Sequence, residues 1–214
     1  MGFRRAAACF GIGFVVLEVT GFVLWGSPPG TKDPASYITR YFAAAGDVPK
    51  IGTVLNALAY TLAVPFIVGF VLPFLKKDRE YGEGYGWLVF GGFLVTGVSA
   101  LAGLSASFAQ VLRGGAELDA AATRVVSDLS NMAYGLAILF MLVWAGGAAV
   151  AIFRRKVMPQ WFGILSALVA LGGITGIVSV VSAGLGLIID VGFVLLVLWV
   201  LVASAIMLRE PTTT

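Results

Sequence analysis

The chain has 214 residues, of which 59% are hydrophobic and only 12% are charged, and its formal net charge is +3. Soluble domains usually carry about 25% charged residues, so this composition excludes a soluble globular protein. The apolar residues form runs of about 18 or more, which is long enough to cross a hydrocarbon core about 30 Å thick. The sequence therefore predicts an integral membrane protein.

Two residue types that often carry chemistry are scarce. Cys9 is the single cysteine, which excludes an internal disulfide and a multi-cysteine metal cluster. The chain has no histidine, which excludes His-ligated haem, histidine zinc sites and Ser-His or Cys-His catalytic pairs. We therefore expect no cofactor, no metal site and no catalytic residue. We also expect no nucleic-acid partner, because the basic residues sort by membrane side instead.

The predicted fold class is an all-α membrane protein, a bundle of six transmembrane helices in a single domain over residues 1–214. The first span, about 6–25, follows the basic pair Arg4 and Arg5. Its apolar core of about 20 residues and its exit GSPPG, which lacks a small-x-small cleavage site, favour a retained span over a signal peptide. The other spans are expected at about 51–75, 87–112, 125–153, 161–183 and 191–208.

A short amphipathic helix at about 34–45 is predicted between the first two spans, in DPASYITRYFAAAGD. Asp33 is placed to cap it and Pro34 to occupy its first turn. One face of this helix collects the apolar residues Tyr37, Ile38, Tyr41, Phe42 and Ala45. Such a helix is typical of an anchor on the outer membrane surface. A lid over the mouth of the bundle is the alternative.

An internal repeat relates the middle of the chain to itself. LNALAYTLAVPF (55–66) and LSNMAYGLAILF (129–140) align without gaps at an offset of 74, with six of twelve positions identical. The same offset pairs Trp87 with Trp161. The pattern indicates two helical hairpins related by an axis along the membrane normal. Chance similarity between alanine- and leucine-rich spans is the alternative.

Three segments also resemble a known family. They are YITRYFAAAGDVPKIGTVLNALAYTLAVPFIVGFVLPFLKK, GYGWLVFGGF and RRKVMPQWFGILSALVALGG, the last with a basic-x-x-Pro-x-Trp turn at Lys156, Pro159 and Trp161. Over nearly all of its length the chain resembles a bacterial family of six-span integral membrane proteins of unknown function. The resemblance implies an architecture and brings no activity with it. Members often carry Arg and Glu in the third span, where this chain has only WLVFGGF (87–93).

One glutamate, Glu18, lies in the apolar run FVVLEVTGFVLW. It is seven residues before Trp25, about 10 Å below the outer interface at 1.5 Å per residue. A carboxyl group at membrane depth costs about 2.5–3.5 kcal/mol on the insertion scale, which makes it a candidate functional group. Because no cation lies in its run, we expect Glu18 to face the bundle interior and to be protonated for much of the time.

Other polar residues are predicted in the same outer half of the bundle. Asn56 and Tyr60 share a face of the second span, and Asp128, Asn131 and Tyr134 lie in the fourth. We expect an outward-facing polar cavity that binds a ligand or a proton, with Glu18 bonded to Asn56, Tyr60, Asn131 or Tyr134. The alternative is a set of interhelical hydrogen bonds that only hold spans together. Further polar groups expected there are Ser99, Ser105, Ser107, Gln110 and Asp190.

Three functions are compatible with these features. The first is binding or transport of a small molecule, lipid or amphiphile in the outer cavity. The second is a non-catalytic accessory subunit that associates with itself or with a membrane partner through small-residue faces such as Gly172 and Gly176. An intramembrane enzyme is the least favoured. Membrane lipids are expected partners in every case.

The basic residues predict the orientation in the membrane, which the family resemblance implies is the plasma membrane of a bacterium. With the N-terminus inside, nine lysines and arginines lie on the cytoplasmic side and five outside, which places both termini in the cytoplasm. In a Cys9→Ala background, a cysteine at Thr31 or Glu117 should react with an impermeant thiol reagent added from outside. A cysteine at Asp78 should react only after permeabilisation, and the reverse pattern would contradict the orientation.

Overall fold

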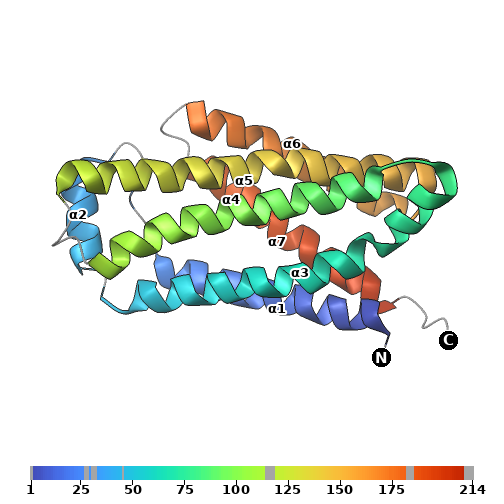
Figure 1. Ribbon diagram of the computed structural model, residues 1–214, viewed down its shortest axis with the longest axis horizontal. Helices are drawn as coiled ribbons and strands as arrows, with labels where there is room; N and C mark the ends of the chain where they lie inside the picture. Colours follow the sequence, from blue (N-terminus) through green and yellow to red (C-terminus); the bar gives the residue numbers. More distant parts are fainter. Residues whose placement is uncertain are drawn as a thin grey trace.

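The computed structural model is shown in Figure 1. It describes residues 2–26, 29, 33–44, 46–113, 119–181 and 186–209, with side chains for all of these except 175–181 and 186–190. Within these ranges the regular structure is helical, which confirms the all-α fold class. The helices are α1 (Phe3–Trp25), α2 (Ala35–Ala44), α3 (Val48–Tyr81), α4 (Tyr85–Arg113), α5 (Ala120–Arg155), α6 (Gln160–Val181) and α7 (Gly186–Arg209).

Each predicted span corresponds to one helix, and α2 is the predicted amphipathic helix. In the described part of the chain, five helices are long and apolar enough to cross a membrane: α1, α3, α4, α5 and α7 from Val191. The part of α6 whose side chains are described, Gln160–Ile174, is an apolar stretch that alone is shorter than a span. The length and composition of the five helices indicate a membrane protein, whereas the count of six spans stays a prediction.

The long helices run roughly along one axis, and the two ends of the bundle differ (Figure 1). At one end α2 lies across the others, and we call this the α2 end. The opposite end carries the start of α1, the α3–α4 and α5–α6 turns and the end of α7, and we call it the terminal end. Basic residues that the sequence assigns to the cytoplasm, such as Arg4, Lys77 and Arg155, belong to helix ends found there.

The helices pack as two groups. α1 packs on α3, while α5 packs on α4 on one side and on α6 on the other. α7 contacts both α1 and α6, crossing the bundle diagonally (Figure 1). The two groups therefore meet through α3 and α4 and through α7, which leaves room between α1 and α5 at the α2 end.

Aromatic rings fill the core toward the terminal end. The fully buried Trp199 of α7 lies 4.7 Å from the rings of both Phe70 and Trp144, measured between centroids, and 5.4 Å from Phe162. Its Nε1 donates to Ser166 Oγ at 2.9 Å. Between helices in lipid, close packing and hydrogen bonds replace the hydrophobic effect as the source of association. This cluster therefore joins α3, α5, α6 and α7 into one body.

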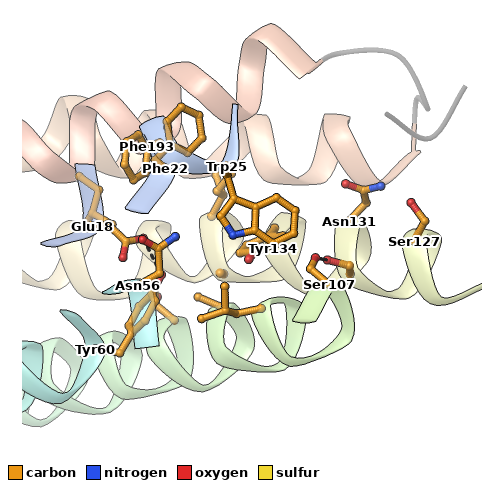
Figure 2. A pocket seen from close by; sticks show the side chains of 18 of the residues that line it. Glu18, Phe22, Trp25, Asn56, Tyr60, Ser107, Ser127, Asn131, Tyr134 and Phe193 are labelled. Carbon is orange, nitrogen blue, oxygen red and sulfur yellow. Dashed lines mark hydrogen bonds between the residues drawn. The ribbon is translucent and has the colours of Figure 1, made fainter. Parts of the chain in front are cut away.

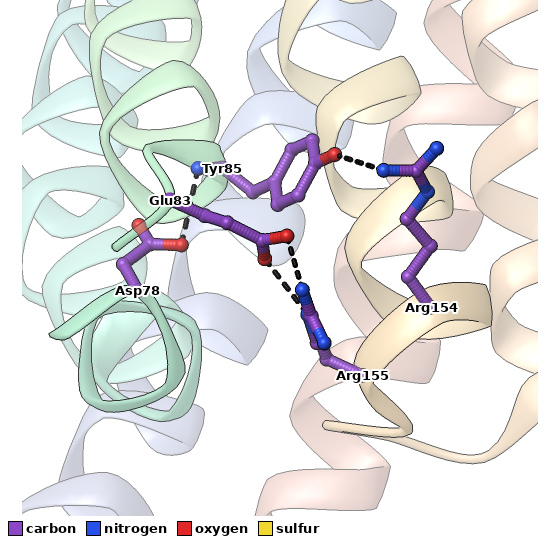
Figure 3. A network of polar contacts seen from close by, with 5 residues as sticks. All are labelled: Asp78, Glu83, Tyr85, Arg154 and Arg155. Atoms are coloured by element: carbon purple, nitrogen blue, oxygen red, sulfur yellow. Dashed lines mark hydrogen bonds and ion pairs between the residues drawn. The ribbon is translucent and has the colours of Figure 1, made fainter. Parts of the chain in front are cut away.

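A polar network fixes the turns at the terminal end (Figure 3). The buried Asp78 accepts from the backbone N–H groups of Tyr85 and Gly86, at 3.1 and 2.6 Å, and so caps the start of α4. Arg155 pairs with Glu83, bonding both carboxylate oxygens and holding the pKa of that carboxyl below its usual value. Because Asp78 is buried, the exposed Arg79 is the better position for the cysteine in the labelling test.

The repeat offset also matches burial along α3 and α5. The pairs Thr53 and Ser127, Asn56 and Ser130, and Phe70 and Trp144 are buried at both members. Tyr60 and Tyr134 line one common cavity. Equivalent positions therefore face the interior in both helices. Duplication itself stays a prediction.

Close contact between α1 and α3 depends on Gly21. A Cβ there would lie 1.6 Å from Asn56 Oδ1 and 2.7 Å from the backbone oxygen of Gly52. Gly21→Ala should therefore lower the free energy of unfolding by about 1–3 kcal/mol, as overpacking does. Gly91→Ala is the matched control, because a Cβ there meets nothing within 4 Å, and it should not destabilise. Apparent Tm values in detergent that fall equally for both variants would contradict this assignment.

Candidate functional site

A cavity of about 460 Å³ lies between the two helix groups, toward the α2 end (Figure 2). Its wall is apolar for the most part, with a smaller number of polar side chains. The polar members are Glu18, Asn56, Tyr60, Thr96, Ser107, Gln110, Ser127, Ser130, Asn131 and Tyr134. Pockets for small ligands have this size and this mixture of apolar wall and few polar groups.

Glu18 faces the interior, as predicted, and is only 6% exposed. Its Oε1 accepts from the hydroxyl of Tyr60 at 3.3 Å, whereas its Oε2 is buried and has no partner among the described residues. Tyr60 is one of the four hydrogen-bond partners that the sequence predicts. An ionised carboxyl would need a donor at Oε2, and a protonated one would need an acceptor, so either form leaves one hydrogen bond unmade.

The packing of α1 on α3 places this carboxyl. The side chain of Asn56 fits against Gly21, one turn from Glu18, and lines the cavity beside it. The ring of Tyr60 meets Phe14 edge-on, with centroids 5.9 Å apart, which holds its hydroxyl near Glu18. Figure 2 shows Glu18, Asn56 and Tyr60 gathered at one end of the cavity.

The polar groups of α4 and α5 bond mainly to each other. Ser130 Oγ donates to the backbone oxygen of Gly103 at 2.9 Å, so the 2.6 Å contact between Ser107 and Ser130 has Ser107 as donor. Gln110 Nε2 donates to the backbone oxygen of Thr123 at 2.7 Å. These contacts agree with the alternative in which polar residues only hold the helices together, because the groups bond to one another across the α4–α5 interface.

Four predicted residues join Glu18 in the cavity wall: Asn56, Tyr60, Asn131 and Tyr134. The prediction that Asp128 belongs to this cavity was wrong. Its carboxylate pairs with Arg124 one turn away, at 3.2 Å, and it does not line the cavity. Asp128 and Asn131 are three residues apart, which is less than a full helical turn of about 3.6 residues. Their side chains therefore point in different directions from α5, and that of Asp128 points toward Arg124.

Other predicted polar groups differ in their outcome. The exposed Ser105 donates to the backbone oxygen of Leu101 on its own helix and does not line the cavity, and neither does Ser99. The side chain of Asp190 lies outside the described residues. Among the described residues, no group of three His, Cys, Asp or Glu side chains is placed to hold a metal ion.

The apolar wall contains residues that sequence reasoning missed. Phe22 of α1 stacks on Phe193 of α7, with ring centroids 4.8 Å apart, and both line the cavity (Figure 2). Leu196 and Gly192 continue this wall along α7. In a helix that is apolar all round, no periodicity marks the side that faces a cavity. The signal that could have found them is therefore absent from the sequence.

α2 covers the bundle at the cavity's α2 end. Its buried Ile38 and Phe42 pack with Trp25 and Val111, as the predicted apolar face requires, and Phe42 lines the cavity. Tyr41 donates to the backbone oxygen of Trp25 at 2.7 Å. The helix begins at Ala35, one residue later than predicted, with the Pro34 carbonyl accepting its first bonds; Ala45 lies outside the described residues.

Arg124 ties α5 to the segment that leads into α2. Its guanidinium donates to the backbone oxygen of Asp33 at 2.7 Å while also pairing with Asp128. Trp25 Nε1 donates to Thr53 Oγ1 at 2.9 Å, which joins the end of α1 to α3. α2 therefore rests on protein through both apolar and polar contacts, so membrane contact is not its only support.

No family model, curated protein or solved structure matches the chain. The resemblance to a six-span bacterial family therefore stays a prediction. The fold defines a helical membrane protein, and the candidate site rests on the cavity and its residues.

Glu18 can be tested by two substitutions that separate shape from polarity. Glu18→Gln keeps the shape and an oxygen that can accept from Tyr60, so it should preserve folding. Glu18→Leu leaves that buried hydroxyl without an acceptor, which costs about 1–3 kcal/mol. Thermal unfolding in detergent should therefore show a lower apparent Tm for Leu and little change for Gln. Asp128→Asn is the control acid outside the cavity, and a Leu variant as stable as wild type would contradict the assignment.

Proposed function

We propose that this protein binds a small apolar or amphiphilic molecule in the cavity beside Glu18. The observation that carries the proposal is the buried Oε2 of Glu18, which has no partner in the described part of the chain and belongs to the wall of a cavity of ligand size. Buried polar groups in proteins are nearly always hydrogen-bonded. A ligand with a polar end would supply the missing partner at Glu18.

The site would be reached from outside the cell. In this proposal the chain crosses the plasma membrane of a bacterium six times, with α6 as a span and both termini in the cytoplasm. The α2 end is then the outer end, in agreement with the excess of basic residues at the other. Membrane lipids surround the bundle, whose exposed faces carry large apolar side chains such as Val98, Val125 and Val194.

The aromatic core favours binding in a one-ended cavity over a continuous pore. Below Glu18, the buried rings of Phe66, Phe93, Trp144 and Trp199 fill the bundle. A protein interior that is packed this densely does not deform continuously, but switches between discrete arrangements of its side chains. Transport through the bundle would therefore require these rings to repack, whereas binding requires no such change.

The accessory-subunit alternative depends on small-residue faces that are free to meet another protein. Several of these are occupied within the chain. A Cβ on Gly69 would lie 2.3 Å from Ala7, and one on Gly173 would lie 2.6 Å from the backbone nitrogen of Leu142. Gly172 faces Leu195 in the same way, at 2.8 Å. These glycines therefore already pack closely against other helices of this chain.

Filling the cavity tests the proposal. Ala100 is buried and lines the cavity, whereas Val98 on the same helix is 67% exposed. Ala100→Phe should abolish ligand-induced stabilisation and Val98→Phe should leave it unchanged. The measurement is the apparent Tm in detergent with a panel of neutral, cationic and anionic amphiphiles. A ligand at about 100 times its Kd stabilises the folded state by about 2.7 kcal/mol.

Two results would count against binding. Either no member of the panel raises the apparent Tm of wild type, or the ligands that raise it act equally on Ala100→Phe. If the purified wild type also carries a stoichiometric protein partner, the accessory-subunit alternative is favoured.

A further inference from the structure

We propose that the ligand is a lipophilic organic cation, held with its positive charge at the carboxylate of Glu18 and its apolar body against the aromatic wall. This inference rests on the proposed binding function and names its substrate class. It follows from three properties of the cavity: the sign of its charge, its open hydrogen-bonding position and its ring content.

The charge of the cavity has one sign. Among the described residues that line it, Glu18 is the one acid, and there is no lysine or arginine. At the α2 end, Lys50 is paired with Asp47 and Arg124 with Asp128. Because an ionised carboxylate in a low-dielectric site requires a compensating charge, a bound cation is the ligand that lets Glu18 ionise.

The hydrogen-bonding position at Glu18 is unfilled. Tyr60 reaches Oε1 at 3.3 Å, and Oε2 has no partner among the residues that the structure describes, although the side chain is more than nine-tenths buried. Asn56 Oδ1 is also buried without a partner within the described ranges. An ammonium group with N–H donors would bond to Oε2 directly, whereas a quaternary cation, which has no donor, would be held at the carboxylate by its charge alone.

Aromatic rings surround the same space. Phe22 and Phe193 form one stacked wall, and Tyr60, Tyr134 and Trp25 line the cavity from α3, α5 and the end of α1. Ring faces attract cations, and the attraction is stronger where water is displaced. The same rings offer apolar surface to the body of a hydrophobic ion.

An anionic ligand does not fit the charge of this site. It would repel an ionised Glu18, and beside a protonated Glu18 its charge would be buried without a counter-charge. Beside a neutral amphiphile the carboxyl of Glu18 would stay protonated, so this ligand would gain no attraction from a carboxylate charge. The cavity therefore selects by sign among molecules of the same shape.

Tetraphenylphosphonium and tetraphenylborate test this selection, because the two ions share one shape and differ in sign. Binding of each is measured by equilibrium dialysis to the full-length protein in detergent. The Ala100→Phe variant corrects for uptake by the micelle. We expect tetraphenylphosphonium to bind wild type at least about tenfold more tightly than tetraphenylborate. Glu18→Gln should weaken the cation by a similar factor, and Asp128→Asn should leave it unchanged.

Proton competition gives a second readout. Protonation of Glu18 removes its charge, so affinity for tetraphenylphosphonium should fall as the pH falls, by up to about tenfold per pH unit. The titratable groups beside Glu18 are Tyr60 from α3 and Tyr134 from α5, and the described lining residues of α4 and α7 carry none. Since tyrosines remain neutral across the acidic range, the dependence should vanish in Glu18→Gln.

The outcomes separate this inference from the function on which it rests. If tetraphenylborate or a neutral amphiphile binds as tightly as the cation, and Ala100→Phe removes that binding, the cavity is a binding site and the cation assignment is wrong. The assignment also fails if Glu18→Gln binds the cation like wild type. If neither ion nor any neutral amphiphile binds in a manner that Ala100→Phe abolishes, both proposals are wrong.

Discussion

The carboxyl group of Glu18 carries a free-energy cost wherever hydrocarbon surrounds it, and the α2 half of the bundle is arranged around that cost. At membrane depth the cost is about 2.5–3.5 kcal/mol even on the insertion scale. The chain meets part of it with the hydroxyl of Tyr60 and by turning Glu18 away from the lipid-facing surface. The other carboxyl oxygen lies in the wall of a cavity without a partner among the described residues, and this distinguishes Glu18 from a side chain that only makes a structural hydrogen bond.

Several other polar side chains have hydrogen-bond partners that the structure shows, in contrast to Oε2 of Glu18. Ser107, Ser130 and Gln110 lie at the same end of the bundle, yet each has a partner across the α4–α5 interface. Asp78 and Glu83 at the terminal end are likewise bonded, one to the start of α4 and the other to Arg155. Among the described residues two acids are buried: Asp78 is bonded at a helix end, whereas Glu18 lies in the cavity. Satisfied networks of this kind stabilise a unique packing.

The two halves of the bundle have different physical characters. Toward the terminal end, Trp199 and its ring neighbours pack α3, α5, α6 and α7 closely. Toward the α2 end, α1 and α5 stand apart, and the space between them is lined by Glu18, Tyr134 and the Phe22–Phe193 stack. The closely packed half at the terminal end holds the helices that form the cavity wall in fixed positions. α2, attached through Tyr41 and Arg124, covers the opposite end.

The sequence by itself determined the helices and the burial of Glu18. Apolar runs of span length must be helical, because backbone groups in hydrocarbon bond within their own segment, and a lone acid in such a run must face protein. Spacing also predicted the apolar face of α2 at Ile38 and Phe42. Only the tertiary structure decided which polar residues share the cavity: Asp128 turned to Arg124, and Phe193 entered the wall. The sequence of a helix that is apolar on every side does not indicate which side faces which neighbour. The rotation of each helix about its axis and the helices that it contacts therefore depend on packing in the folded bundle.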